Sequence, residues 1–167
     1  FCNLLTGHMR GGLAQVSVLL SCLMGGISGS ATADAAMESR ILGPDMEKRG
    51  YSKGFTAAIL AMGGLITSTI PPSLGLILYG VTGEVSIGRL FLAGMIPGIL
   101  MTAALMISVA FISKKRDYKP EHESFPSIGE VLKGLVENIW ALLFPVILIV
   151  GIRFGIFTPS EAGAFAV

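Results

Sequence analysis

The stretch Ile66-Thr67-Ser68-Thr69-Ile70-Pro71-Pro72-Ser73 places two prolines and four hydroxyl groups inside an otherwise apolar run. The prolines lack the N–H groups that would pair with the carbonyls of Thr67 and Ser68, and Ile70 precedes a proline, which disfavours helical angles. The sequence therefore predicts a helix that breaks in mid-membrane. In hydrocarbon such a break is tolerated only within protein or beside a polar cavity, since unpaired backbone groups are costly there.

The residues around this break suit a site for two ions of opposite charge. The freed carbonyls of Thr67 and Ser68 and the hydroxyls of Thr67, Ser68 and Thr69 form an all-oxygen cluster, a donor set that favours a small hard cation. A helix that restarts near Pro72 directs its positive N-terminal end, together with the Ser73 hydroxyl, at an anion. A cation site beside an anion site on a discontinuous helix is the usual layout of a secondary transporter.

The composition indicates a membrane protein. Mean hydropathy is +0.74, and 52% of the residues are hydrophobic while 14% are charged, against about 25% charged in an average soluble domain. The net charge of +1 and the absence of a basic stripe argue against nucleic-acid binding. Cys2 and Cys22 lack metal-ligand spacing and are interpreted as small buried residues. Because the chain begins at Phe1 and stops within an apolar run, we expect it to be a piece of a longer polytopic protein.

A re-entrant helical hairpin is predicted over residues 1–45. The apolar run 13–24 has 12 residues and spans roughly 18 Å, too short to cross a bilayer. A glycine and serine turn at 25–30 follows, and then a second short arm over 31–42. Basic residues flank both ends of this hairpin, so both mouths are expected to face the cytoplasm.

The rest of the chain is expected to alternate between membrane spans and loops. Ten of the twelve Lys and Arg residues then fall on the inner side. Trp140 is interpreted as an interfacial anchor, and Pro145 is expected to kink its span. The predicted segments are a cytoplasmic loop with the broken transmembrane helix (46–80), a segment that consists of an outer loop (81–88) and the transmembrane helix after it (81–113 in all), a cytoplasmic loop with an amphipathic interfacial helix (114–138), and a transmembrane helix with the start of the next (139–167). Thr158 or Ser160 is expected to cap that last helix, with Glu161 as a capping acid rather than a ligand.

Five motifs occur here in one order, and together they resemble the large membrane subunit of tripartite ATP-independent periplasmic (TRAP) transporters. The resemblance covers essentially all 167 residues. The motifs are GGISGSATADAA (25–36), GPDMEKRGYSKGF (43–55), TSTIPPS (67–73), LFLAGMIPG (90–98) and GIFTPSEAGA (155–164).

This resemblance implies a sodium-driven importer of organic acids, usually carboxylates, in the bacterial inner membrane. It implies a small membrane subunit and an extracytoplasmic solute-binding protein as partners, and transport by an elevator movement. The implied fold is an all-α, ion-transporter-like architecture of two inverted repeats, each with a re-entrant hairpin and a proline-broken helix. One repeat and the connection to the second are present here, so the complete substrate site lies beyond this chain.

Candidate site residues come from the hairpin turn and from the break. The predicted sodium ligands are Ser28, Gly29, Ser30, Thr67, Ser68 and Thr69, and the predicted substrate-binding residues are Ser30, Asp34, Pro72 and Ser73. For Asp34 two interpretations stay open. An acid within the membrane is a functional candidate, but this one can also brace the turn or stabilise the start of its helix. Sodium is the expected coupling ion, and no organic cofactor is expected.

Three alternative functions are an intramembrane protease, a divalent-anion symporter and a structural subunit. Residues 26–29 match the short GxSG pattern of rhomboid-type intramembrane serine proteases, but that reaction needs a base near the serine. The two histidines, His8 and His122, lie before the hairpin and in the polar loop, so the chain is not expected to be an enzyme. A divalent-anion symporter that works without a binding protein is the second transporter hypothesis. In a purely structural membrane subunit, the polar break would have no role in binding or transport.

Overall fold

The computed structural model describes residues 1–120, 126–154 and 156, and its regular elements are all helices. Within these ranges no strand is present, which confirms the predicted all-α class. The helices are α1 (Cys2–Thr6), α2 (Gly12–Gly25), α3 (Ala31–Ile41), α4 (Gly43–Lys48), α5 (Lys53–Thr69), α6 (Leu74–Thr82), α7 (Ile87–Lys115), α8 (Ile128–Glu137) and α9 (Ile139–Arg153).

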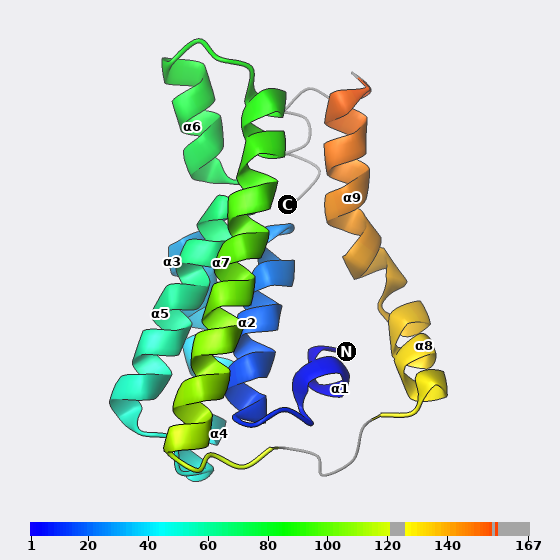
Figure 1. Ribbon diagram of the computed structural model, residues 1–167. Coiled ribbons are helices and arrows are strands. Elements are labelled where there is room, and N and C mark those ends of the chain that lie inside the picture. The colour runs from blue at the N-terminus through cyan, green and yellow to red at the C-terminus, as the bar shows by residue number, and fades with distance from the viewer. Residues whose placement is uncertain (121–125, 155, 157–167) are drawn as a thin grey trace.

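The predicted hairpin is formed by α2 and α3. In Figure 1, α2 rises from the lower end of the molecule to about half its height, and the chain then returns through α3 to α4. The start of α2, α4, the start of α5 and the end of α7 all lie at that lower end. Both mouths of the hairpin therefore open on the same side as the basic C-terminal turn of α7, Lys114 and Lys115, as the distribution of charges predicts.

The broken helix consists of α5 and α6. The two helices are bent by 43° about the four residues between them, and together they are long and apolar enough to form one broken span. Figure 1 shows α5 rising beside the hairpin and α6 continuing to the top of the molecule. The predicted interruption at residues 70–73 is confirmed. The peptide bond between Pro71 and Pro72 is cis.

Helix α7 returns along the full height of the molecule (Figure 1). It has 29 residues with Pro97 inside, and its length and hydropathy suit a membrane crossing; at about 1.5 Å per residue it is roughly 43 Å long. Two small residues, Gly94 and Gly98, face the break. A Cβ atom built on Gly94 lies 2.8 Å from the Thr69 carbonyl oxygen, and one on Gly98 lies 2.5 Å from Ile70 Cγ1. Glycine at these positions lets the two backbones approach closely.

Helices α8 and α9 occupy the predicted amphipathic and apolar segments. A capping box begins α8, since Ser127 Oγ accepts a hydrogen bond from the Glu130 N–H and a Glu130 carboxylate oxygen accepts one from the Ser127 N–H. Helix α9 continues through Pro145 as one α-helix. The expected loop 81–88 is shorter than predicted, because α6 continues to Thr82 and α7 begins at Ile87. The capping predictions for Thr158, Ser160 and Glu161 fall outside the described residues.

The core lies where α2, α5 and α7 meet. Its buried side chains include Val18 of α2, Ile66 of α5 and Val109 of α7. Near the lower end, the Tyr51, Phe55 and Tyr118 rings pack together, with the Tyr51 and Tyr118 centroids 4.3 Å apart. Large apolar side chains of α6 and α7 point outward. That distribution is typical of helices that contact lipid on one side and protein on the other.

The close approach of α7 to the break generates a stability prediction. In Gly94→Ala the added methyl group meets the Thr69 carbonyl oxygen, a backbone atom that cannot rotate away, so we expect a loss of roughly 1–3 kcal/mol. Gly54→Ala is the matched control, because nothing lies within 4 Å of its Cβ position. Thermal unfolding of the complete purified protein should show a lower midpoint for Gly94→Ala alone. Equal midpoints would contradict the close contact.

Candidate functional site

The hairpin turn lies between the end of α2 and the start of α3. The Gly26 and Ser28 N–H groups donate to the carbonyls of Leu23 and Met24 at 3.1 and 2.8 Å, which completes the last turn of α2. Gly29 then adopts a left-handed conformation with φ +60°, which glycine reaches without steric cost. Ser30 is extended and begins α3. The turn therefore reverses the chain within five residues.

The break is closed by Ser73. Ile70 and Ser73 both have extended backbone angles, which end α5 and begin α6. The Ser73 hydroxyl accepts a hydrogen bond from the Leu76 N–H at 3.4 Å, and it donates one to the Ser68 carbonyl at 2.6 Å. One side chain thus caps α6 and satisfies a carbonyl that the prolines leave without its helical partner. Of the two carbonyls expected to be free, that of Ser68 is occupied.

The turn and the break are in direct contact. The Leu74 N–H, at the start of α6, donates to the Gly29 carbonyl at 3.4 Å. Gly29 lies against the Pro72 carbonyl so closely that an added Cβ would collide with it. Residues 29 and 72–74, more than forty positions apart in sequence, therefore form one backbone junction.

Thr67 connects the break to the first arm of the hairpin. Its side chain is fully buried, and its hydroxyl donates to the Ser21 carbonyl of α2 at 3.0 Å. A Cβ on Gly25 would lie 3.0 Å from Thr67 Cα, so α2 and α5 touch here through a glycine. The Thr67 carbonyl would accept from residue 71 in a continuous helix, and Pro71 has no N–H to donate.

Ser68 and Thr69 make different contacts. Both hydroxyls donate back to the Leu65 carbonyl, at 2.9 and 2.8 Å. The Thr69 hydroxyl also lies 3.8 Å from the Met101 sulfur of α7. The contacts of these two hydroxyls are thus with α5 and α7, whereas those of Thr67 are with the hairpin. Because each hydroxyl gives its hydrogen to a carbonyl, its lone pairs remain available to a cation.

Ser28, Ser30 and Asp34 form a small network at the start of α3. The Ser28 hydroxyl donates to Asp34 Oδ1 at 2.7 Å and accepts from the Ser30 N–H at 3.3 Å. Asp34 is 3% exposed, and its Oδ2 is a buried atom without a hydrogen-bond partner in the part of the chain that the structure describes. This is the geometry that the bracing interpretation of Asp34 requires, and it also leaves one carboxylate oxygen for a ligand.

A second polar cluster was missed in the sequence analysis. The Ser17 and Ser21 hydroxyls of α2 donate to the two carboxylate oxygens of Glu38 on α3, each at 2.7 Å. The pattern was present in the sequence, because Ser17 and Ser21, and likewise Asp34 and Glu38, are four residues apart and so share a helix face.

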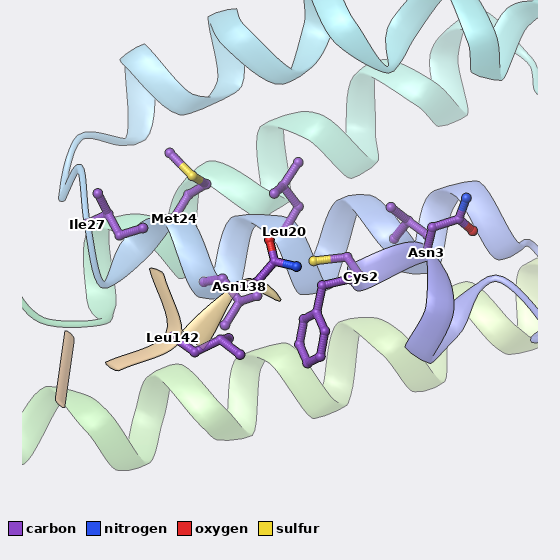
Figure 2. A pocket seen from close by; sticks show the side chains of 10 residues that line it. Cys2, Asn3, Leu20, Met24, Ile27, Asn138 and Leu142 are labelled. Atoms are coloured by element: carbon purple, nitrogen blue, oxygen red, sulfur yellow. The ribbon is translucent and has the colours of Figure 1, made fainter. Parts of the chain in front are cut away.

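A cavity of about 350 Å³ lies on a different face of α2. Figure 2 shows side chains of α1, α2 and α9 converging on it, with Leu20 and Met24 from α2, Ile27 from the turn and Leu142 from α9. The polar side chains around it are those of Asn3 and Asn138, and Asn138 Nδ2 donates to the Gly134 carbonyl. The cavity therefore provides an apolar surface and no cluster of ionic ligands.

Comparisons with known proteins identify relatives along the whole chain. The family model described as "Tripartite ATP-independent periplasmic transporter, DctM component" matches residues 1–167. The 2,3-diketo-L-gulonate TRAP transporter large permease protein of Escherichia coli is 41% identical over 97% of this chain and 38% of its own length. The sialic acid TRAP transporter large permease protein of Vibrio cholerae is 43% identical over 98% of this chain and 38% of its own length. The C4-dicarboxylate TRAP transporter large permease protein of Vibrio cholerae is 39% identical over 99% of this chain and 36% of its own length. The chain thus spans less than two fifths of the length of these three relatives.

The junction between turn and break generates a test at Gly29. Gly29→Ala adds both a strained positive φ, worth about 1–2 kcal/mol, and a collision with the Pro72 carbonyl. Gly50→Ala is the matched control, since Gly50 also has a positive φ, of 84°, but nothing lies within 4 Å of its Cβ position. We expect hydrogen exchange at the Leu74 amide to accelerate in Gly29→Ala and not in Gly50→Ala. Equal effects would mean that strain alone, and not the junction, is being measured.

Proposed function

The chain belongs to the DctM component family of tripartite ATP-independent periplasmic transporters, and from that premise we propose that it carries half of a sodium-coupled site for an organic acid. Secondary transport is the activity, and the chain is part of a large permease subunit. The single observation that carries the proposal is the junction of Gly29 with residues 72–74, where the hairpin turn and the start of α6 meet at the interruption of the broken helix.

An organic acid is the proposed substrate class. The three relatives carry the names of 2,3-diketo-L-gulonate, sialic acid and C4-dicarboxylate transporters, and all three solutes bear a carboxylate. Helix α6 supports this class, because it begins at Ser73 in the interior of the broken helix and directs the positive end of its dipole toward the junction. A carboxylate at the junction would face the positive N-terminal end of α6, and the absent half of the site would close over it.

Sodium is the proposed coupling ion. The predicted ligands fit it chemically. Ser28, Gly29 and Ser30 of the turn and Thr67, Ser68 and Thr69 at the end of α5 offer hydroxyl and carbonyl oxygens, and Asp34 offers a buried carboxylate oxygen. Hydroxyls that donate to carbonyls can still ligate a cation through their lone pairs. When bound, the ion would supply a positive charge that draws the turn and the break together and offsets the charge of the incoming acid.

The family also supports the proposed partners and location. We place the complete protein in the bacterial inner membrane as a multi-pass protein, together with a small membrane subunit and an extracytoplasmic solute-binding protein. Helix α7, long and apolar enough to cross, and the broken pair α5 and α6 support membrane insertion. Large permease subunits are transporter components and not enzymes, and here the Ser28 hydroxyl donates to Asp34 rather than to a histidine.

Sodium ligation generates a prediction for transport. In the complete permease, Ser28→Ala or Thr69→Ala removes one proposed oxygen ligand, and we expect the sodium concentration for half-maximal uptake to rise about three- to tenfold, the size of one lost polar contact. Ser39→Ala is the control, because its exposed hydroxyl bonds only within α3. Uptake into proteoliposomes at graded sodium checks this. An unchanged sodium dependence in both site variants would remove the assignment.

A second prediction separates the proposed transporter from a divalent-anion symporter. The TRAP architecture requires a soluble binding protein to deliver the solute, so proteoliposomes that hold the complete permease and its small subunit should accumulate solute only when that protein is added outside. The control is the same assay with a binding protein that does not bind the solute. Sodium-driven uptake in the absence of any binding protein would favour the symporter.

A further inference from the structure

Glu38 is a buried acid for which the proposed site has no use. Its side chain is 1% exposed, and its Oε1 and Oε2 accept hydrogen bonds from the Ser21 and Ser17 hydroxyls, each at 2.7 Å. The cluster lies between the two arms of the hairpin, with the serines on α2 and the acid on α3. A carboxyl group in such surroundings requires a physical account, because burial of an unpaired charge is costly.

Helix α5 closes the cluster from its third side. A Cβ built on Gly63 would collide with the Ser21 hydroxyl and would lie 3.8 Å from Glu38 Oε2. No basic side chain of the described residues forms an ion pair with Glu38. Because α2, α3 and α5 already bury the carboxyl group, a segment outside this chain cannot reach it without displacing one of these helices.

The hydrogen-bond geometry fits a neutral carboxylic acid. The Ser21 hydroxyl has one hydrogen and two acceptors in range, Glu38 Oε1 at 2.7 Å and the Ser17 carbonyl at 3.0 Å. With a proton on Oε1, Glu38 donates to Ser21, Ser21 donates to the Ser17 carbonyl, and the Ser17 hydroxyl donates to Oε2. Every group is then satisfied without a buried charge.

The neighbouring charges favour the same state. Asp34 lies one turn earlier on the same face of α3, so two ionised carboxylates would repel each other there. The nearby faces of α2 and α5 contribute serine and glycine. The charged side chains of α4 are exposed and pair elsewhere. Lys48 lies 3.3 Å from Asp45, and Glu47 lies 3.9 Å from Lys53 at the start of α5.

We propose that Glu38 is a positioning residue with a protonated, neutral carboxyl group. It fixes α3 against α2 and α5 and thereby holds the turn and the break in register. Two contacts connect it to the site. The Ser21 backbone carbonyl accepts from Thr67 at 3.0 Å, and Asp34, on the same face of α3, accepts from Ser28 at 2.7 Å. The effect on transport rests on the proposed function, whereas the effect on the hairpin itself does not.

The test compares Glu38→Gln with Glu38→Ala in the complete permease. Glutamine reproduces a neutral acid, since its amide N–H donates to Ser21 and its oxygen accepts from Ser17, whereas alanine removes the bonds of both hydroxyls to the side chain at position 38. We expect hydrogen exchange of the turn amides, residues 26–30, to accelerate about tenfold in Glu38→Ala, the size of a lost buried hydrogen bond, and to stay within about twofold in Glu38→Gln. The sodium concentration for half-maximal uptake should likewise rise in Glu38→Ala and stay close to the wild-type value in Glu38→Gln.

Infrared spectroscopy supplies the readout that a purely structural residue would not change. The wild type should show the C=O stretch of a protonated buried carboxyl group, and Glu38→Gln should lose it. Glu47→Gln, at an exposed acid of α4, is the control that should keep it. Where Glu38→Ala fails to fold, Ser17→Ala combined with Ser21→Ala tests the same bonds and should also accelerate exchange.

Three results would overturn the inference. Hydrogen exchange of the turn amides could accelerate as much in Glu38→Gln as in an alanine variant, it could stay unchanged in the alanine variants, or Glu38→Gln could keep the C=O stretch of the carboxyl group. Sodium-independent uptake by the wild type is a different result. It would refute the proposed function and leave the exchange and infrared tests of Glu38 standing.

Discussion

A helix interrupted inside an apolar molecule has to find partners for the backbone groups that it exposes, and the fold of this chain follows from how it does so. Pro71 and Pro72 lack two N–H groups that α5 would need in order to continue. Ser73 satisfies one of the carbonyls left behind, and the Gly29 carbonyl accepts the first N–H of α6. The hairpin is therefore needed for the break to exist in hydrocarbon, and the break in turn gives the hairpin turn something to pack against.

Glycines make this mutual support possible, because they let neighbouring elements approach closely. Gly25 and Gly63 bring α2 and α5 together, Gly29 meets Pro72, and Gly94 meets the end of α5. A larger side chain at any of them would separate two helices and open the polar centre. Close backbone packing of this kind brings polar residues of α2, α3 and α5, far apart in the sequence, into one small region.

Those features that depend on local chemistry could be predicted from the sequence. The break at Pro71 and Pro72 could be placed to the residue, because a missing N–H is a property of the residue itself, and the glycines at 25–30 predicted the turn. The family was identified correctly from five motifs. Contacts between helix faces could not be predicted. Glu38 was overlooked because its partners lie on another helix, and the Ser68 carbonyl was expected to be free because a serine five residues later had no evident reason to bond back to it.

The arrangement of Asp34 and Glu38 has a consequence for biogenesis. Both acids are on α3, and the Glu38 carboxyl group also lies against Gly63 of α5, which the ribosome makes later. Until α5 emerges, the side of Glu38 that Gly63 covers would be open, and exposure of a carboxyl group to lipid acyl chains is costly. This cost favours insertion of the hairpin together with the helix that follows it.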